Sequence, residues 1–114
     1  MIQDGWTRYE IEDLLGTAEP DELAEVPIVV SLDPPDADWA QEICLDLTDH
    51  EDPVVRGNAV LALGHLARTT GDLDEERARA AIAAGLEDDD EYVRGQAEAA
   101  ADDVENYMEW VIER

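Results

Sequence analysis

The sequence predicts an all-α fold, a short right-handed α-solenoid of about three antiparallel helical hairpins. Three observations predict it. Apolar residues recur at helical spacing along the 114-residue chain, and a stretch near its middle recurs 38 residues later. Phe is absent, and there are only three Trp and three Tyr. Because small aliphatic residues dominate, close helix packing is favoured over an aromatic-rich sheet, and hairpins repeated at a fixed period form a solenoid.

The organising stretch is 52–68, DPVVRGNAVLALGHLAR, which recurs at 90–106 as DEYVRGQAEAAADDVEN. The residues that have an identical partner at the constant offset of 38 include Asp52, Val55, Arg56, Gly57 and Ala59. In the first copy Asp52 is a candidate N-cap, and Pro53 suits the first helical position, where its missing N–H has no partner. Ala59, Leu63 and Leu66 then form a buried stripe at helical spacing, so this stretch is predicted to be a packing helix.

Three helices are predicted before this stretch. Thr7 and Glu10 form a capping box for a helix over about residues 8–15. Pro20 begins a second helix, which Pro27 should kink or shorten, and residues 28–30 could alternatively be extended. Asp36 or Asp38 can cap a third helix, which carries the apolar face of Trp39, Ile43, Cys44 and Leu47.

Two further helices complete the prediction, one over residues 77–86 and a long one from 92 to about 113. Six helices then make three hairpins. Residues 1–114 are predicted to be a single domain, in which 1–35 is a degenerate N-terminal hairpin and 36–70 and 75–113 are the recognisable repeats. The long last helix would close the end of the stack with its aromatic residues.

The pattern D-P-x-V-R-x-x-A followed by A-L-G-x-L resembles the second helix of a HEAT-type helical repeat. In such repeats the Asp caps the helix and the Arg bonds to a loop carboxylate of a neighbouring repeat. The resemblance therefore implies structural roles for Asp52, Arg56, Asp90 and Arg94. The second copy departs from the pattern, because Glu91, Ala101 and Asp102 replace Pro53, Leu63 and Gly64, so its helix should pack more thinly. The resemblance also implies that the second helices line a concave surface.

Four side chains at spacings of 3, 4 and 3 flank the buried stripe of 52–68; they are Asn58, Leu61, His65 and Arg68. Shifted by 38, they become Gln96, Ala99, Asp103 and Asn106, and Tyr107 follows. On neighbouring second helices these side chains would form a shallow groove whose amide, imidazole, guanidinium and aromatic groups suit protein binding. The alternative is packing. His65 could bond to a neighbouring carboxylate, and Tyr107 and Trp110 could close the last helix onto the stack.

The charge balance excludes several classes of partner. The chain has 31 Asp and Glu against 7 Arg, no Lys, and a formal net charge of −24. Such a surface repels nucleic acid and anionic lipid and attracts cationic partners at rates that fall with salt. The acidity has three possible origins, namely recognition of a basic protein, adaptation to a saline cytoplasm, or the compositional bias of a GC-rich genome. With 16 acids in residues 1–57 and 15 in 58–114, one dedicated patch is disfavoured.

Motifs for catalysis or metal binding are not recognisable in the sequence. His50 and His65 have no Ser or Cys at a motif spacing, although a partner in space is left open. One Cys and two distant His give no zinc signature, and an EF-hand beginning at Asp88 would need Gly where Val93 stands. Cys44 lies in an apolar run and is expected to be a buried thiol. We expect no enzyme activity, no cofactor and no metal. Without a signal or membrane segment, a cytoplasmic protein is expected.

The leading functional prediction is a non-catalytic acidic interaction module that binds a basic protein through its concave face. In size, charge and fold the chain is similar to bacterial immunity proteins, which neutralise a basic toxin by covering its active site. One alternative is a homo-oligomeric scaffold that pairs through exposed apolar residues near the C-terminus, from Tyr107 to Ile112. Another is a chromophore-handling subunit, because HEAT-like proteins also resemble phycobilin lyases. A monomer or weak homodimer is expected.

Overall fold

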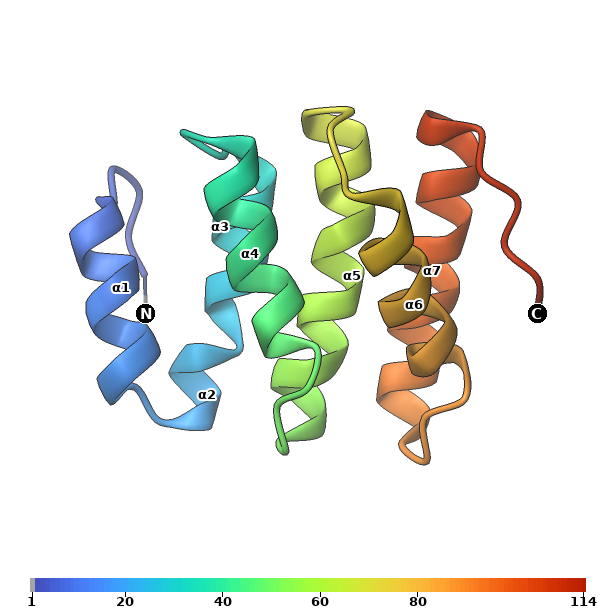
Figure 1. Cartoon of the computed structure of the whole chain (residues 1–114). Helices are drawn as coiled ribbons and strands as arrows, with labels where there is room; N and C mark the ends of the chain where they lie inside the picture. Colours follow the sequence, from blue (N-terminus) through green and yellow to red (C-terminus); the bar gives the residue numbers. More distant parts are fainter. Residues whose placement is uncertain (1) are drawn as a thin grey trace.

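The computed structural model describes residues 2–114, which contain seven helical segments and no strand. They are α1 (Arg8–Thr17), α2 (Pro20–Leu23), α3 (Glu25–Leu32), α4 (Ala37–Leu47), α5 (Pro53–Thr69), α6 (Glu75–Leu86) and α7 (Glu91–Met108). These segments form three antiparallel hairpins, α1 with α2–α3, α4 with α5, and α6 with α7 (Figure 1). One layer holds α3, α5 and α7 side by side, and α4 and α6 form the other. The predicted all-α solenoid is confirmed.

Side-chain caps begin the helices where the sequence indicates. Thr7 and Glu10 make a complete capping box at α1. Asp52 Oδ1 accepts the backbone N–H groups of Val54 and Val55 at 2.9 and 3.1 Å, with Pro53 in the first turn. Asp36, Asp74 and Asp90 cap α4, α6 and α7 in the same manner. Each cap satisfies N–H groups that have no partner inside the helix.

The helix that contains Pro27 is broken one turn before the proline. α2 ends at Leu23 and α3 begins at Glu25, with Ala24 between them. Pro27 has no N–H to donate to the carbonyl of Leu23, and its ring crowds that carbonyl, so the regular helix is interrupted there. The predicted kink is present, whereas the alternative of an extended segment is wrong, because residues 28–30 are helical.

The last helix is shorter than predicted. α7 ends at Met108 instead of about residue 113, and Glu109 adopts a left-handed φ of 60° that turns the chain back. Trp110 and Ile112 are then buried while Val111 and Glu113 are exposed. This alternation has a period of two, which suits an extended chain and not a helix. The tail is held by Arg79, whose guanidinium lies 5.4 Å from the centre of the Trp110 ring and donates to the Val111 carbonyl at 2.8 Å.

The first hairpin is anchored by aromatic and ionic contacts. The rings of Trp6 and Trp39 stack with centroids 6.1 Å apart, which ties the segment before α1 to α4. Arg8 lies 4.9 Å from the centre of the Trp39 ring and pairs with Asp36 at 3.6 Å. These contacts join the degenerate hairpin to the second one, and a cation over an indole adds to the stacking.

The core consists mainly of small aliphatic side chains between the two layers. In α5 its fully buried members include Val55, Ala59, Ala62, Leu63 and Leu66. Cys44 is also fully buried, and burial raises the pKa of its thiol well above the usual range, so it stays protonated. None of the helices in residues 2–114 combines the length and apolar character needed to cross a bilayer.

Candidate functional site

The predicted stripes lie on the layer of second helices, on the side opposite the buried residues of α5. We call this surface the second-helix face. It is made of the exposed and half-buried residues of α3, α5 and α7, namely Ile28, Val29, Asn58, Leu61, His65, Arg68, Gln96, Ala99 and Asp103. Asn106 and Tyr107 extend it along α7, where both are exposed.

Asn58 joins three helices at one end of this face. Its Nδ2 donates to the carbonyl of Ala24 at 2.9 Å, at the break between α2 and α3. Its Oδ1 accepts from the Tyr92 hydroxyl at 2.5 Å and from Gln96 Nε2 at 3.3 Å, both on α7. Gln96 Nε2 also donates to the Tyr92 hydroxyl at 3.0 Å. The network uses both ends of the Asn58 amide, and it fixes the spacing of the helices on either side.

His65 forms a second connection between helices on this face, to α3. Its Nδ1 lies 3.1 Å from Oγ of Ser31, and that hydroxyl is also 3.1 Å from the carbonyl of Ile28. Burial lowers the pKa of His65, Arg68 lowers it further, and Asp103 acts in the opposite direction. A neutral imidazole is therefore favoured at pH 7. Sequence reasoning did not find Ser31.

Ser31 and His65 are two of the residue types found in hydrolytic triads, but the Ser31 hydroxyl is not accessible to a substrate. Ser31 has no exposed surface, so a substrate cannot reach its Oγ in this arrangement. The Ser31 backbone carbonyl accepts a bond from Thr69 Oγ1 at 2.9 Å. Together these bonds tie α3 to α5, and the pair acts as an inter-helix bridge.

The polar contacts between second helices occur at two sequence separations. Three of them, Ser31–His65, Ala24–Asn58 and Asn58–Tyr92, join residues 34 apart. Two others, Ser31–Thr69 and Asn58–Gln96, join residues 38 apart. Because the second helices run in the same direction, a residue faces its repeat equivalent and the residue one helical turn before it. The repeat period could therefore have identified Ser31 and Tyr92 from the sequence.

Arg56 lies away from this face and joins consecutive repeats. Its Nε and Nη2 donate to the two carboxylate oxygens of Asp88 at 2.7 and 2.9 Å, and Nη1 donates to the carbonyls of His50 and Glu51. The bond from Arg56 lowers the pKa of Asp88. This is the kind of contact that the resemblance to HEAT repeats implies. Arg94 repeats one of these contacts, because its Nη1 donates to the backbone carbonyl of Asp88 at 2.7 Å, just as Nη1 of Arg56 donates to the carbonyl of His50 six residues earlier.

The other predicted residues of this face differ in their exposure. Leu61 is half-buried and Arg68 is exposed, and no ion pair within residues 2–114 includes Arg68. Asp103 is half-buried against α5 at Gly64. Tyr107 is 48% exposed, near the end of α7. The structure thus brings Asn58 together with Gln96 and places Asp103 beside α5, while Asn106 and Tyr107 lie toward the far end of the face.

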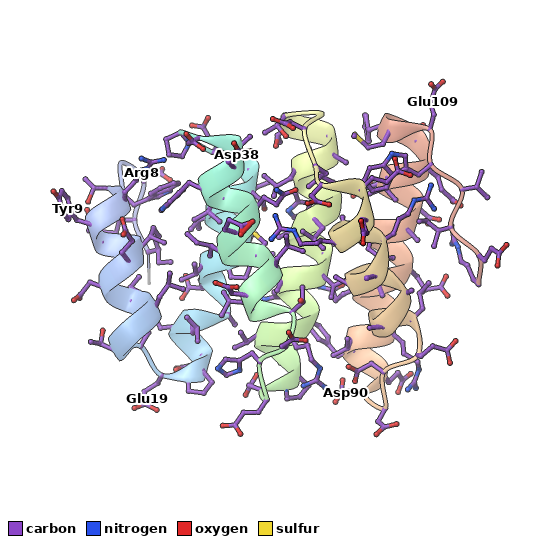
Figure 2. All side chains as sticks on the ribbon, in the orientation of Figure 1. Arg8, Tyr9, Glu19, Asp38, Asp90 and Glu109 are labelled. Carbon is purple, nitrogen blue, oxygen red and sulfur yellow. The ribbon has the colours of Figure 1, made fainter. Side chains whose placement is uncertain are left out.

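The acids are distributed unevenly in space. No Asp or Glu occurs between Pro53 and Gly71, so α5, at the centre of the layer, carries none. In α3 the only acid is Glu25, at its first position. Acids are prominent toward the ends of the helices, as Glu19, Asp90 and Glu109 show in Figure 2. A centre without carboxylates inside an acidic surround matches the depletion of Asp and Glu that protein interfaces show at their centre. The even count of acids in residues 1–57 and 58–114 does not reveal this difference between α5 and its surroundings.

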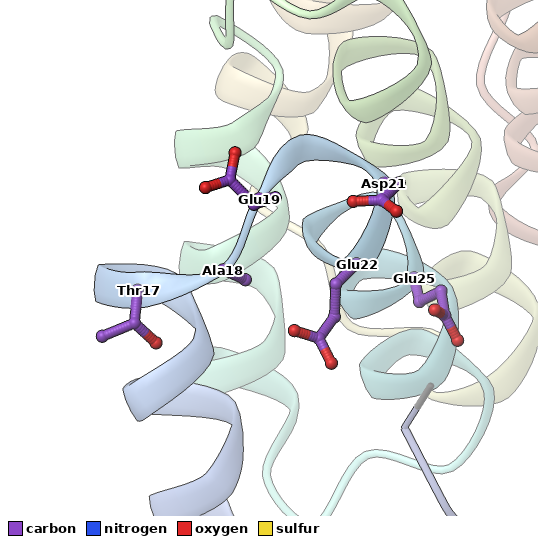
Figure 3. Close-up of a pocket in the computed structure, with 6 residues that line it drawn as sticks. All are labelled: Thr17, Ala18, Glu19, Asp21, Glu22 and Glu25. Carbon is purple, nitrogen blue, oxygen red and sulfur yellow. The ribbon is translucent and has the colours of Figure 1, made fainter.

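Two hollows lie beside the break between α2 and α3. The first, about 340 Å³, opens between α3 and α5 and is lined by Asp21, Ala24, Glu25, Ile28, Val29 and Asn58. The second, about 370 Å³, opens between α1 and α2, and Figure 3 shows its lining residues Thr17, Ala18, Glu19, Asp21, Glu22 and Glu25. Asp21 and Glu25 line both. Within residues 2–114 no group of three or more His, Cys, Asp or Glu is arranged to hold a metal ion.

Comparison with known proteins is consistent with this architecture. The family model for HEAT repeats matches residues 27–102. A search of curated proteins found no match. Among solved structures, a chain in the crystal structure of a CDI complex from Cupriavidus taiwanensis LMG 19424 is 24% identical, with a TM-score of 0.77. The likeness covers 94% of this chain and 96% of that chain, so the shared fold includes α1 and α2, which precede the residues that the family model matches.

Proposed function

Because the chain belongs to the HEAT-repeat family, we propose that it is a non-catalytic module that binds a protein through its second-helix face. The observation that carries the proposal is that α5, at the centre of this face, has no Asp or Glu in a chain with a net charge of −24. Outward residues such as Leu61 supply apolar contact, and the bonds of Asn58 and His65 hold the helices in place beforehand. A preorganised surface loses less entropy on binding.

We further propose that the partner is a basic protein with a toxic activity, and that this chain is its immunity protein. The acidic surround would attract a cationic partner and accelerate association at low salt. The structurally similar chain belongs to a CDI complex, which is consistent with a role in an assembly. Protection would follow if the bound module covered the functional surface of the toxin in the cytoplasm.

The experiment is co-expression with a candidate basic toxin, chosen from the genes that neighbour the gene for this chain, followed by calorimetric titration of the purified pair. Leu61→Arg places a charge at the centre of the face. We expect it to weaken binding at least tenfold and to abolish growth protection, with little change in melting temperature. Ala83→Arg is the matched control, because Ala83 is exposed on α6 in the other layer. Equal binding by both variants would contradict the assignment of the face.

A homo-oligomeric scaffold is the second candidate, and it is supported by the exposed apolar residues near the C-terminus. Val111 is 75% exposed and Tyr107 is 48% exposed. The charge of −24 on each chain opposes self-association at low salt, so a dimer of this kind should form more readily as salt rises. Light scattering coupled to size exclusion at low and high salt distinguishes it from a monomer.

A further inference from the structure

We infer that the hollow between α3 and α5 receives an arginine side chain of the protein partner. This inference rests on the proposed function and deepens it by naming the chemistry of one contact. The hollow lies at the edge of the second-helix face, beside Asn58, and its volume is about 340 Å³. An anchor residue bound there would fix the register of the partner on the face.

The lining of the hollow matches the two parts of an arginine side chain. Ala24, Ile28 and Val29 provide an apolar surface, and Asp21 and Glu25 contribute carboxylates. An arginine can lay its aliphatic stem along apolar side chains while its guanidinium donates to carboxylates at the edge. A purely apolar side chain would leave those two carboxylates unpaired and partly desolvated, which is unfavourable.

The local charge favours a cation more strongly here than elsewhere on the face. Asp21 and Glu25 also line the adjoining hollow, whose other acids are Glu19 and Glu22 (Figure 3). Within residues 2–114 no arginine forms an ion pair with Asp21 or Glu25, because the arginines in ion pairs bind other carboxylates. Oε1 of Glu25 accepts a long bond of 3.4 Å from the backbone N–H of Ile2. An incoming guanidinium would therefore meet the two carboxylates of Asp21 and Glu25, which no arginine of residues 2–114 pairs with.

The hollow is held open by bonds already described. Asn58 donates to the carbonyl of Ala24, and Tyr92 and Gln96 hold the other end of the Asn58 amide. Asp21 and Glu25 lie four residues apart on either side of the helix break, so two carboxylates approach one site from successive turns. Two carboxylates suit the planar, multiply donating guanidinium better than the point charge of lysine.

The test uses the whole chain and N-acetyl-arginine amide as the probe, followed by ¹H–¹⁵N correlation spectra. We expect saturable shifts of the amide signals of Ala24, Ile28 and Val29. The apparent affinity of N-acetyl-lysine amide should be at least threefold weaker, and the neutral near-isostere N-acetyl-citrulline amide should give no saturable shift. The double variant D21N/E25Q should lose the response to arginine.

The control variant is D46N/D49N, which also removes two negative charges, but from exposed positions at the end of α4. It should retain the response of the wild-type chain. Shifts spread over all acidic segments, with equal weakening in both double variants, would show general electrostatic attraction and overturn the inference, as would the absence of shifts. Since no protein partner is used, this result is separate from the Leu61→Arg test. If the arginine probe does not bind, the proposed function is still supported by the partner test. If the partner test fails, the arginine site in the hollow can still be confirmed by the probe.

Discussion

The close approach of α5 and α7 depends on Gly64, and an alanine at this position tests it. A Cβ atom at residue 64 would lie 2.8 Å from Oδ2 of Asp103 and 3.0 Å from Cα of Ala100. The Asp103 side chain can rotate away from the new Cβ atom, whereas the clash with the Ala100 backbone is removed only if α7 moves. Forced overpacking costs about 1–3 kcal/mol, while replacing a mid-helix glycine by alanine gains about 1 kcal/mol in backbone entropy. We expect a net loss of up to about 2 kcal/mol.

Gly95→Ala is the matched control, because Gly95 also lies inside a long helix but a Cβ there would meet nothing within 4 Å. Only the propensity gain applies, so this variant should be more stable than the wild type by about 0.5–1 kcal/mol. The two variants should then differ by about 1–3 kcal/mol, or roughly 4 °C in melting temperature per kcal/mol for a domain of this size. Urea denaturation and calorimetry measure both quantities. If Gly64→Ala proved as stable as Gly95→Ala, the helices could not pack as closely as described.

Three further substitutions test other contacts. Arg56 holds the pKa of Asp88 below its usual range, so the pair stabilises the fold above about pH 4 and the contribution disappears as the pH falls through the lower folded value. Asp88→Asn should cost about 2 kcal/mol near neutral pH and should flatten the acid limb of a pH–stability curve. Burial lowers the pKa of His65 in the folded state, so stability should decrease as the pH falls below the unfolded value of about 6.5. His65→Gln should remove that decrease. If the pH–stability curve of His65→Gln matched that of the wild type, the imidazole of His65 would titrate as it does in water. Trp110→Ala should lower the free energy of unfolding by about 3 kcal/mol, measured by thermal unfolding. If the loss were no larger than that of a substitution on the exposed surface, the C-terminal tail would not be docked.

The helix starts could be predicted because their causes are local. Thr7, Asp36, Asp52 and Asp90 each cap a helix through backbone atoms two or three residues away, and such spacings are readable in any sequence. The end of α7 depends on a different kind of information. Whether Trp110 continues a helix or folds back is decided by the surface of α6 that it can cover, and that surface exists only after the hairpins stack.

The candidate site could be predicted in part. The 3-4-3 spacing placed Asn58, Leu61, His65 and Arg68 on one side of α5, but it did not say which edge of the stripe a neighbouring helix would cover. Asn58 bonds both to Ala24 and to α7, and His65 bonds to Ser31 of α3, whereas Leu61 is half-buried and Arg68 is exposed. The hollow at Asp21 and Glu25 was not predictable, because it depends on the angle at which the chain turns between α2 and α3.

The absence of acids from α5 could reflect packing or a binding surface. The exposed positions of α5 distinguish these two causes, because packing does not exclude acids there. Buried positions such as Leu63 exclude acids for packing reasons alone. Val54 is 44% exposed in the first turn of α5, where a carboxylate would gain from the helix dipole. All six other helical segments in residues 2–114 carry an acid in their first turn, and α5 has none. Neither packing nor helix stability requires this exception, and it is consistent with the proposed binding of a partner at the second-helix face.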